Sequence, residues 1–286
     1  MEIKNIIKEH ITWRHQIFNL AKSDLKKTYS GAALGWAWAF IKPIVTIFIY
    51  WFAFSFGLRK KAGIDGFPFI LWLIAGMVCW FYISEMWNSG PTAMRRYTFL
   101  ITKMKFPTST IPTFFSLSHI VVQCVLVSLV MIVYILSGKG VSVYYIQLPF
   151  YMLLMFVMMT GWCLFSSVLG AMSKDFTNLV KAFSTALFWM SGMMFPISTI
   201  ENVWARRILM ANPVTFVVEG YRNCFVHHKW FYQSPAELGL FLAETLIMWY
   251  AAVRVFKKMK KEINKLTELM ELKKHELQNE YYRMIA

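Results

Sequence analysis

The chain has 286 residues, of which 57% are hydrophobic, 17% aromatic and only 16% charged, and its formal net charge is +15. A soluble domain averages about 25% charged residues, so this sequence lacks the polar side chains that would cover a water-facing surface. Soluble enzymes, basic nucleic-acid-binding domains, secreted disulfide scaffolds and disordered chains are therefore excluded. The four cysteines agree, because their spacing fits neither a disulfide framework nor a metal site. The composition predicts an all-α polytopic membrane protein.

Long apolar runs along the chain predict six transmembrane helices. A helix that crosses about 30 Å of hydrocarbon needs about 20 largely apolar residues. The segments that meet this requirement are Trp36–Leu58, Phe67–Trp87, Phe114–Leu136, Ile146–Leu169, Leu179–Ile197 and Leu238–Phe256. Together with their connections they form a predicted transmembrane domain over residues 31–256.

The basic residues indicate the orientation of these spans. With a cytoplasmic N-terminus, 22 of the 30 Lys and Arg residues fall on the cytoplasmic side and 8 on the outer side. This asymmetry satisfies the positive-inside rule, and an even number of spans returns the C-terminus to the same side. The lysines of the first 30 residues are scattered rather than followed by a short apolar core, which does not fit a cleavable signal peptide. We expect a multi-pass protein of the cell (plasma or inner) membrane with both termini in the cytoplasm.

The two ends of the chain predict helices outside the spans. Residues 1–30 place apolar residues at largely helical spacing among lysines, which favours an amphipathic helix in the cytoplasmic membrane interface. A solvated basic helix that only sets the topology is the alternative. Residues 257–286 are highly charged with a broken apolar stripe, which predicts a cytoplasmic tail helix.

Two segments between the spans differ from ordinary loops. The cytoplasmic segment 88–107 mixes apolar residues with basic ones such as Arg95 and Arg96, so it can form a short helix that docks onto a partner. Charge that only sets the topology explains this segment equally well. The outer segment 198–235 contains an apolar run and an aromatic cluster but is too short to cross twice. We expect a re-entrant pair of helices there, with a plain surface loop as the alternative.

The sequence contains no recognisable catalytic or metal-binding motif. A G-x-x-x-x-G-K-[ST] phosphate loop is missing, so the chain does not bind ATP in that manner. His227 and His228 have no nearby third ligand in the sequence and are interpreted as interfacial polar residues. Lys42, Glu85 and Glu244 are isolated charges within the spans and do not form a proton relay, and Lys42 is expected to extend to the interface. We predict neither catalytic residues nor a bound metal or cofactor.

Aromatic side chains are concentrated in the first and fifth predicted spans. Aromatic rings can stack against the apolar faces of sugars, and Trp and Tyr add hydrogen bonds. Lipid-facing belts and helix packing also explain such residues, and composition alone favours that explanation. The aromatic residues concerned include Trp36, Trp38, Phe40, Tyr50, Phe183, Phe188, Trp189 and Phe195.

The order of several short motifs resembles the membrane subunits of type-2 ABC exporters for cell-surface polysaccharides, over roughly Lys8 to Phe256. The motifs are Ser23-Asp24-Leu25-Lys26-Lys27-Thr28-Tyr29, Leu34-Gly35-Trp36-Ala37-Trp38, Lys42-Pro43-Ile44, Lys103-Met104-Lys105-Phe106-Pro107, Ser173-Lys174-Asp175, Phe195-Pro196-Ile197, Asn212-Pro213 and Glu219-Gly220-Tyr221-Arg222. Within this family, the stretches Gly66-Phe67-Pro68-Phe69 and His228-Lys229-Trp230-Phe231 look most like the wall teichoic acid exporters. Lys174 stands where the family usually has arginine.

The resemblance implies a homodimer of this chain paired with two separate ABC ATPase subunits, which would hold ATP and Mg²⁺. It further implies export of a lipid-linked anionic glycopolymer, teichoic acid-like, from the cytoplasmic to the outer face, without making or breaking a bond in the polymer. Exporters of O-antigen or capsule are the alternative within the same fold. A membrane scaffold, or a glycosyltransferase working without ATP, is the alternative from another class. No nucleic-acid partner is expected.

The same resemblance implies roles for individual residues. Spans 1 and 5 of the two subunits would line the channel, and the segment 88–107 would couple it to the ATPase. The implied channel residues are Trp36, Phe40, Tyr50, Phe188, Trp189 and Phe195, and the lysines at the headgroup entrance are Lys22, Lys26, Lys27 and Lys42. The implied coupling residues are Arg95, Arg96, Phe99 and Lys103, and those of the outer gate are Asn212, Pro213, Glu219 and Arg222.

Overall fold

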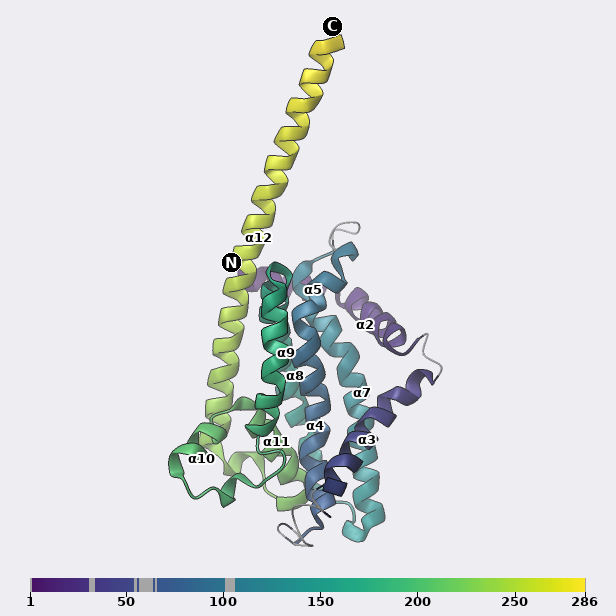
Figure 1. Cartoon of the computed structure of the whole chain (residues 1–286), viewed down its shortest axis with the longest axis vertical. Coiled ribbons are helices and arrows are strands. Elements are labelled where there is room, and N and C mark those ends of the chain that lie inside the picture. Colours follow the sequence, from purple (N-terminus) through teal and green to yellow (C-terminus); the bar gives the residue numbers. More distant parts are fainter. Residues whose placement is uncertain are drawn as a thin grey trace.

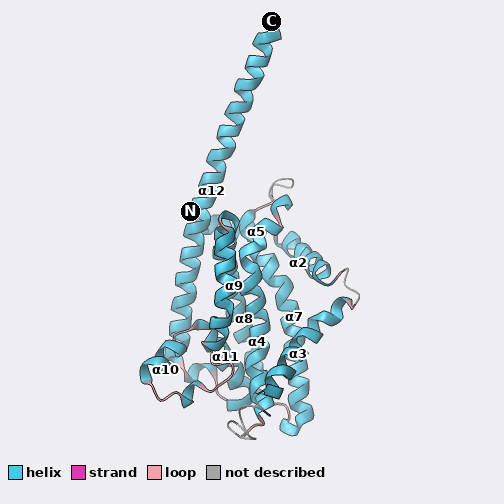
Figure 2. Cartoon of the chain, viewed as in Figure 1, coloured by secondary structure: helices cyan, strands magenta, loops and turns pink. Residues whose placement is uncertain are grey.

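The computed structural model describes residues 2–30, 34–53, 56, 64, 66–100 and 106–285. Within these ranges the chain forms helices and connecting turns, with no strand and one isolated antiparallel bridge between Ile64 and Phe67. The helices form an elongated bundle with both chain termini toward one end, called the termini end below (Figure 1). The opposite end of the bundle is called the far end. Figure 2 shows the same view coloured by secondary structure. The expected all-α architecture is confirmed.

Among the described residues, five helices are long and apolar enough to cross a membrane: Gly35–Phe52, Phe69–Leu100, Thr108–Lys139, Val143–Met172 and Pro235–Lys261. Their α-helical parts are α3 (Trp38–Phe52), α4 (Phe69–Ser89), α5 (Ala93–Arg96), α7 (Ile111–Tyr134), α8 (Leu148–Met172) and the first half of α12 (Pro235–Ile285). Each of the five helices overlaps a predicted span, although the second continues past its predicted end at Trp87, and residues 54–55 and 57–58 of the first span lie outside the described residues. Short 3₁₀ or π turns lie at Gly35–Ala37, Gly90–Thr92, Thr108–Thr110, Ile135–Lys139, Val143–Gln147, Ile197–Thr199, Asn223–His227 and Phe231–Gln233.

The boundaries predicted for the fifth span, Leu179–Ile197, are wrong. The helix found here, α9 (Lys174–Trp189), has 16 residues, so it is about 24 Å long and shorter than the hydrocarbon core. It begins early because the Ser173 hydroxyl accepts a hydrogen bond from the backbone N–H of Phe176 (3.4 Å) and so caps the helix. It ends early because the chain turns through Gly192, whose φ of 63° favours glycine. The last part of the predicted span is therefore a turn.

Two short helices, α10 (Val203–Met210) and α11 (Pro213–Arg222), follow at the far end (Figure 1). Each is capped by an asparagine, because the side-chain oxygens of Asn202 and Asn212 accept hydrogen bonds from the first backbone N–H groups of the helices. α11 is buried along most of its length, whereas α10 has no buried residue. The expected helix pair is present here, rather than a plain surface loop.

The N-terminal segment folds as two helices, α1 (Glu2–Thr12) and α2 (Arg14–Tyr29), rather than as the single amphipathic helix expected. They meet at Trp13, whose ring packs edge-on against Phe106 with the ring centroids 5.3 Å apart. This contact holds the junction between α1 and α2 against the segment that precedes α7. α2 exposes its lysines and buries a face that ends in Asp24, as an amphipathic helix does.

The last helix, α12, continues without interruption beyond the bundle at the termini end (Figure 1). Its 51 residues correspond to a length of about 77 Å. The tail expected over residues 257–286 is helical as far as it is described, and it continues the last span rather than forming a separate element.

α4 and α8 form the centre of the bundle. Trp87 of α4 stacks on Trp162 of α8 with the ring centroids 4.1 Å apart, and Trp87 Nε1 donates to the carbonyl oxygen of Val180 in α9 (2.8 Å). About two turns further along, near its C-terminal end, α8 approaches the turn after α4 so closely that a Cβ at Gly170 would lie 2.0 Å from the Pro91 carbonyl oxygen. Only glycine permits this approach.

We expect Gly170→Ala to destabilise the bundle by about 1–3 kcal/mol, because the added methyl group forces α8 away from Pro91. Gly239→Ala is the matched control, since a Cβ there has nothing within 4 Å and the substitution should stabilise α12 by up to about 1 kcal/mol. Thermal unfolding of the detergent-purified chain measures both. A Gly170→Ala protein that melts at or above the parent temperature contradicts the close packing.

Candidate functional site

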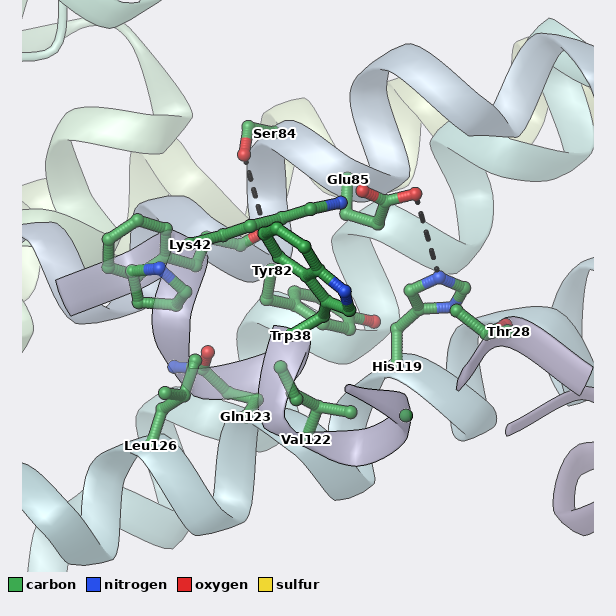
Figure 3. Close-up of a pocket in the computed structure, with 14 residues that line it drawn as sticks. Thr28, Trp38, Lys42, Tyr82, Ser84, Glu85, His119, Val122, Gln123 and Leu126 are labelled. Atoms are coloured by element: carbon green, nitrogen blue, oxygen red, sulfur yellow. Dashed lines mark hydrogen bonds and ion pairs between the residues drawn. The ribbon is translucent and has the colours of Figure 1, made fainter. Parts of the chain in front are cut away.

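A cavity of about 510 Å³ lies between α3, α4 and α7, in the half of the bundle nearer the termini end (Figure 3). Residues from the end of α2 and from the turn before α3 complete its wall. Its polar and aromatic lining includes Lys42 and Trp38 from α3, Tyr82 and Glu85 from α4, and His119 and Gln123 from α7. The cavity therefore combines one cationic side chain with aromatic and hydrogen-bonding groups.

Glu85 and His119 face each other across the cavity, with Glu85 Oε1 3.8 Å from His119 Nε2 (Figure 3). The Ser89 hydroxyl donates to the same carboxylate oxygen (2.7 Å). His119 Nδ1 lies 2.8 Å from the Phe115 carbonyl oxygen, which accepts its hydrogen. Lys42 enters the same space from α3.

Gln123 extends this polar lining toward the core. Its Nε2 donates to the Tyr221 hydroxyl of α11 (3.4 Å), while its buried Oε1 has no hydrogen-bond partner among the described residues. A buried acceptor without a donor costs about 1–3 kcal/mol. The lining thus carries one lysine and one glutamate beside several groups that can form hydrogen bonds with ligand hydroxyls. Within the described part of the chain, no group of three His, Cys, Asp or Glu residues could hold a metal ion.

The four lysines assigned to the entrance lie in two places. Lys22, Lys26 and Lys27 lie on the exposed face of α2, whereas Lys42 lines the cavity. The Lys27 ammonium also lies over the ring of Phe99, 5.7 Å from its centroid. The residues assigned to the entrance therefore contact those assigned to coupling.

The residues assigned to coupling differ in their surroundings. Arg95 is half-buried and donates to the Thr177 hydroxyl in the first turn of α9 (2.8 Å). Arg96 is exposed, with its guanidinium over the Phe115 ring at 5.3 Å from the centroid, and Phe99 is exposed as well. Lys103 lies outside the described residues. Of the three described residues, Arg96 and Phe99 present surface to a partner, while Arg95 holds the segment to α9.

A buried carboxylate connects α2 to the same segment. Asp24 is 5% exposed and accepts hydrogen bonds from the hydroxyls of Tyr97 and Ser118, the latter at 2.5 Å. Burying a carboxylate is unfavourable without such donors, so α2 is bound to both α7 and the coupling segment. The sequence pattern assigned no role to these three residues. The available signal was that Asp24 continues the helical spacing of Ile17 and Ala21, the buried face of α2.

The six aromatic residues assigned to the channel do not form one cluster within a single chain. Tyr50 of α3 stacks on Phe188 of α9 with the ring centroids 5.4 Å apart, and Phe188 also contacts Trp189. Trp36, near the other end of the first span, and Trp189 are 48% and 46% exposed. The remaining two, Phe40 and Phe195, are partly buried. The structure brings α3 and α9 together as expected, with Trp36 about 20 Å along the helix from their contact.

Arg222 is the most deeply buried charge of the far end, with 0% of its side chain exposed. Its guanidinium donates to the Glu219 carboxylate (2.8 Å) and to the carbonyl oxygens of Gly192 and Met193 (both 2.9 Å), and it lies 3.5 Å from the centroid of the Trp72 ring. Burial lowers the pKa of Arg222, and the Glu219 carboxylate opposes this shift. Because arginine is not deprotonated in proteins, the group is a buried cation.

The other residues assigned to the outer gate belong to the same packed unit. Asn212 caps α11, and its Nδ2 donates to the Met190 carbonyl oxygen (3.3 Å), while Pro213 occupies the first turn of that helix. Gly76 of α4 makes room for the guanidinium, since a Cβ there would lie 2.8 Å from Arg222 Nη2. A second cavity, of about 580 Å³, lies beside this unit and is lined by Arg206, Glu219, His227, Lys229 and Glu237 among others.

Comparison with known proteins adds to this geometry. The model of the family described as ABC-2 type transporter matches residues 15–226, a range of 212 residues out of 286 that includes the lining of the cavity at Lys42 and also Arg222. The chain is also 22% identical over 258 residues to the O-antigen export system permease protein RfbA of Myxococcus xanthus. That similarity covers 90% of this chain and 97% of the relative.

We expect Arg222→Ala to destabilise the protein by about 3–5 kcal/mol, because it leaves Glu219 and two buried carbonyl oxygens without their donor. Arg207→Ala, at an exposed position of α10, is the control and should change stability by no more than about 0.5 kcal/mol. Unfolding of the detergent-purified variants gives both values. Equal stability of the two variants is incompatible with a structural role for the buried guanidinium.

Proposed function

Because this chain belongs to the ABC-2 type transporter family, we propose that it is the membrane subunit of an ATP-driven exporter of a lipid-linked cell-surface polysaccharide. Family membership makes it a multi-pass transport permease and not an enzyme. The choice of cargo is supported by the similarity to an O-antigen export permease, which extends over 97% of that protein. A match over nearly the full length favours the same kind of transport rather than one shared module.

ATP hydrolysis in this proposal belongs to a separate ABC ATPase, since this sequence has no phosphate loop. The working complex contains two copies of this chain and two ATPase subunits. Homodimerisation is supported by apolar side chains that α3 and α9 leave uncovered, namely Phe48, Phe52, Phe183 and Trp189. A second copy that covers these faces places α3 and α9 at the boundary between subunits, where a polymer passes between them.

The proposed orientation puts the termini end in the cytoplasm. The basic residues support it, since 22 of 30 fall on that side of the predicted topology. The lysines of α2 then face the cytoplasmic leaflet, where each contributes about 1 kcal/mol to attracting an anionic headgroup. The cavity that contains Lys42 and Gln123 receives the charged and hydroxylated part of the cargo.

The proposed coupling proceeds through contacts at the termini end. The ATPase docks against Arg96 and Phe99, and ATP binding displaces this segment. Tyr97, in the same segment, donates to the buried Asp24 and therefore carries α2 with it. Because α2 borders the cavity at Thr28, its movement opens or closes the entrance. At the far end, the unit built on Arg222 closes the exit.

We propose an anionic, teichoic acid-like polymer as the cargo, because the entrance is lined by lysines and the cavity contains Lys42. The second candidate is an O-antigen, which the relative's name favours. A capsule polysaccharide belongs to the same class of cargo. The two main candidates differ in charge along the polymer, so an experiment that varies charge discriminates between them.

Transport by proteoliposomes that contain this chain and its ATPase tests the cargo. We expect a lipid-linked teichoic acid precursor to be exported, with Lys42→Gln raising its apparent KM about fivefold, which corresponds to the loss of about 1 kcal/mol. Lys8→Gln, on the exposed face of α1, is the control. Export of neutral O-antigen alone, with no effect of Lys42→Gln, selects the second candidate, and export of neither polymer rejects the proposed function.

For coupling, we expect Arg96→Glu to reduce cargo-stimulated ATPase activity about fivefold or more, because it reverses an exposed charge at the docking surface while leaving the Arg95–Thr177 bond intact. Arg207→Glu makes the same charge change at the far end and serves as control. The measurement is ATPase activity of the assembled complex, after co-purification has established normal assembly. Full stimulation of the assembled Arg96→Glu complex argues against this docking surface.

A further inference from the structure

A groove of about 1280 Å³ lies between α1 and α12 at the termini end and belongs to none of the sites above. Its walls are apolar, with Ile7 and Ile11 on α1 and Leu246, Trp249 and Val253 on α12. Both isoleucines and Leu246 are largely exposed, at 53%, 65% and 70%. The groove is therefore an open apolar channel along the surface of the bundle.

The inner face of α1 is fastened to the bundle, which fixes the side that faces the groove. His10 contacts the Thr113 hydroxyl of α7 through Nε2 (2.7 Å), and the Glu9 carboxylate accepts a hydrogen bond from Ser109. Glu9 also lies 3.8 Å from the Lys260 ammonium. Glu9 is thus engaged with the bundle, while Ile7 and Ile11 of α1 line the groove together with Arg14, the first residue of α2.

The end of the groove that lies toward the tail of α12 is strongly basic. The cations among its lining residues are Arg14, Arg254, Lys257, Lys258 and Lys261, and the lining includes no Asp or Glu. Arg254 lies over the ring of Tyr250 at 4.9 Å from the centroid, which directs the guanidinium along the groove. Five positive charges without a lining carboxylate favour an anionic occupant.

Apolar and basic residues follow one another along α12 in the order of a lipid's chain and headgroup. From Leu246 to Val253 the wall is apolar over about 11 Å, and from Arg254 to Lys261 it is basic over about the next 12 Å. A single leaflet contributes about 15 Å of hydrocarbon. The change from apolar to basic therefore falls where a leaflet changes from acyl chains to phosphates.

We propose that this groove binds one anionic phospholipid of the surrounding bilayer. Its acyl chain lies between the isoleucines of α1 and the apolar face of α12, and its phosphate contacts Arg14, Arg254 and Lys257. The lipid bridges two helices that are far apart in the sequence and so holds α1 against the last span. This site is separate from the cavity at Lys42, and the proposal holds whichever polymer the protein exports.

Native mass spectrometry of the purified full-length chain, titrated with phosphatidylglycerol or phosphatidylcholine, tests the site. We expect one phosphatidylglycerol to be retained in preference to phosphatidylcholine. The triple variant Arg254→Gln, Lys257→Gln, Lys258→Gln should weaken that binding on the order of 100-fold. Lys22→Gln with Lys26→Gln and Lys27→Gln is the matched control, because it removes the same charge from α2 and should leave the retained lipid in place.

A second variant separates a bound lipid from general attraction to an anionic surface. Ile11→Trp fills the apolar part of the groove without changing charge, and it should also displace the retained phosphatidylglycerol. Equal retention of the two phospholipids, or equal losses in the groove and control variants, overturns the proposal. Preferential retention of a polyprenyl phosphate over phosphatidylglycerol assigns the groove to the lipid carrier instead. A shift of the groove variants from dimer to monomer, with no lipid retained by the parent, assigns it to a second copy of this chain.

Discussion

The guanidinium of Arg222 is fully buried where α4, α11 and the turn after α9 meet, and the far end of the bundle is arranged around it. Removing this cation from water costs several kcal/mol unless acceptors surround it. Glu219 supplies the opposite charge, and the backbone at Gly192 and Met193 supplies two carbonyl oxygens. Those carbonyl groups are available only because the chain has left the helix. The buried charge and the short length of α9 are therefore two aspects of one arrangement.

A buried charge of the opposite sign organises the termini end. Asp24 accepts hydrogen bonds from Tyr97 and Ser118, so α2, the coupling segment and α7 meet at one carboxylate. The lysines of α2 remain exposed on the opposite face of that helix. An amphipathic helix held by packing alone slides readily along a membrane surface, whereas one held by a buried carboxylate moves together with its donors. This is the physical basis for proposing that movement at the coupling segment reaches the entrance.

Between these two ends, the cavity at Lys42 and the uncovered faces of α3 and α9 are the features that the proposed export uses. The cavity is lined by charged and hydrogen-bonding side chains, among them Lys42, Glu85 and Gln123, whereas the contact between Tyr50 and Phe188 is aromatic throughout. The charged headgroup of the proposed cargo requires the polar environment, and its sugar rings require the aromatic one. A single chain leaves the neighbouring Phe48, Phe52, Phe183 and Trp189 uncovered, which is why the proposed path needs a second copy.

The sequence by itself determined the helical architecture, because crossing hydrocarbon requires about 20 consecutive apolar residues and leaves a pattern that can be read locally. The start of α11 was not predicted, although its Asn212-Pro213 step is a local signal, because an asparagine caps a helix from within a few residues and proline favours the first turn. The early end of α9 and the burial of Asp24 and Arg222 were decided only by the tertiary structure. Arg222 finds its carbonyl acceptors 29 and 30 positions away, and Asp24 finds its donors 73 and 94 positions away. A charged side chain looks solvent-exposed in a local pattern, and only distant groups brought together by folding make its burial favourable.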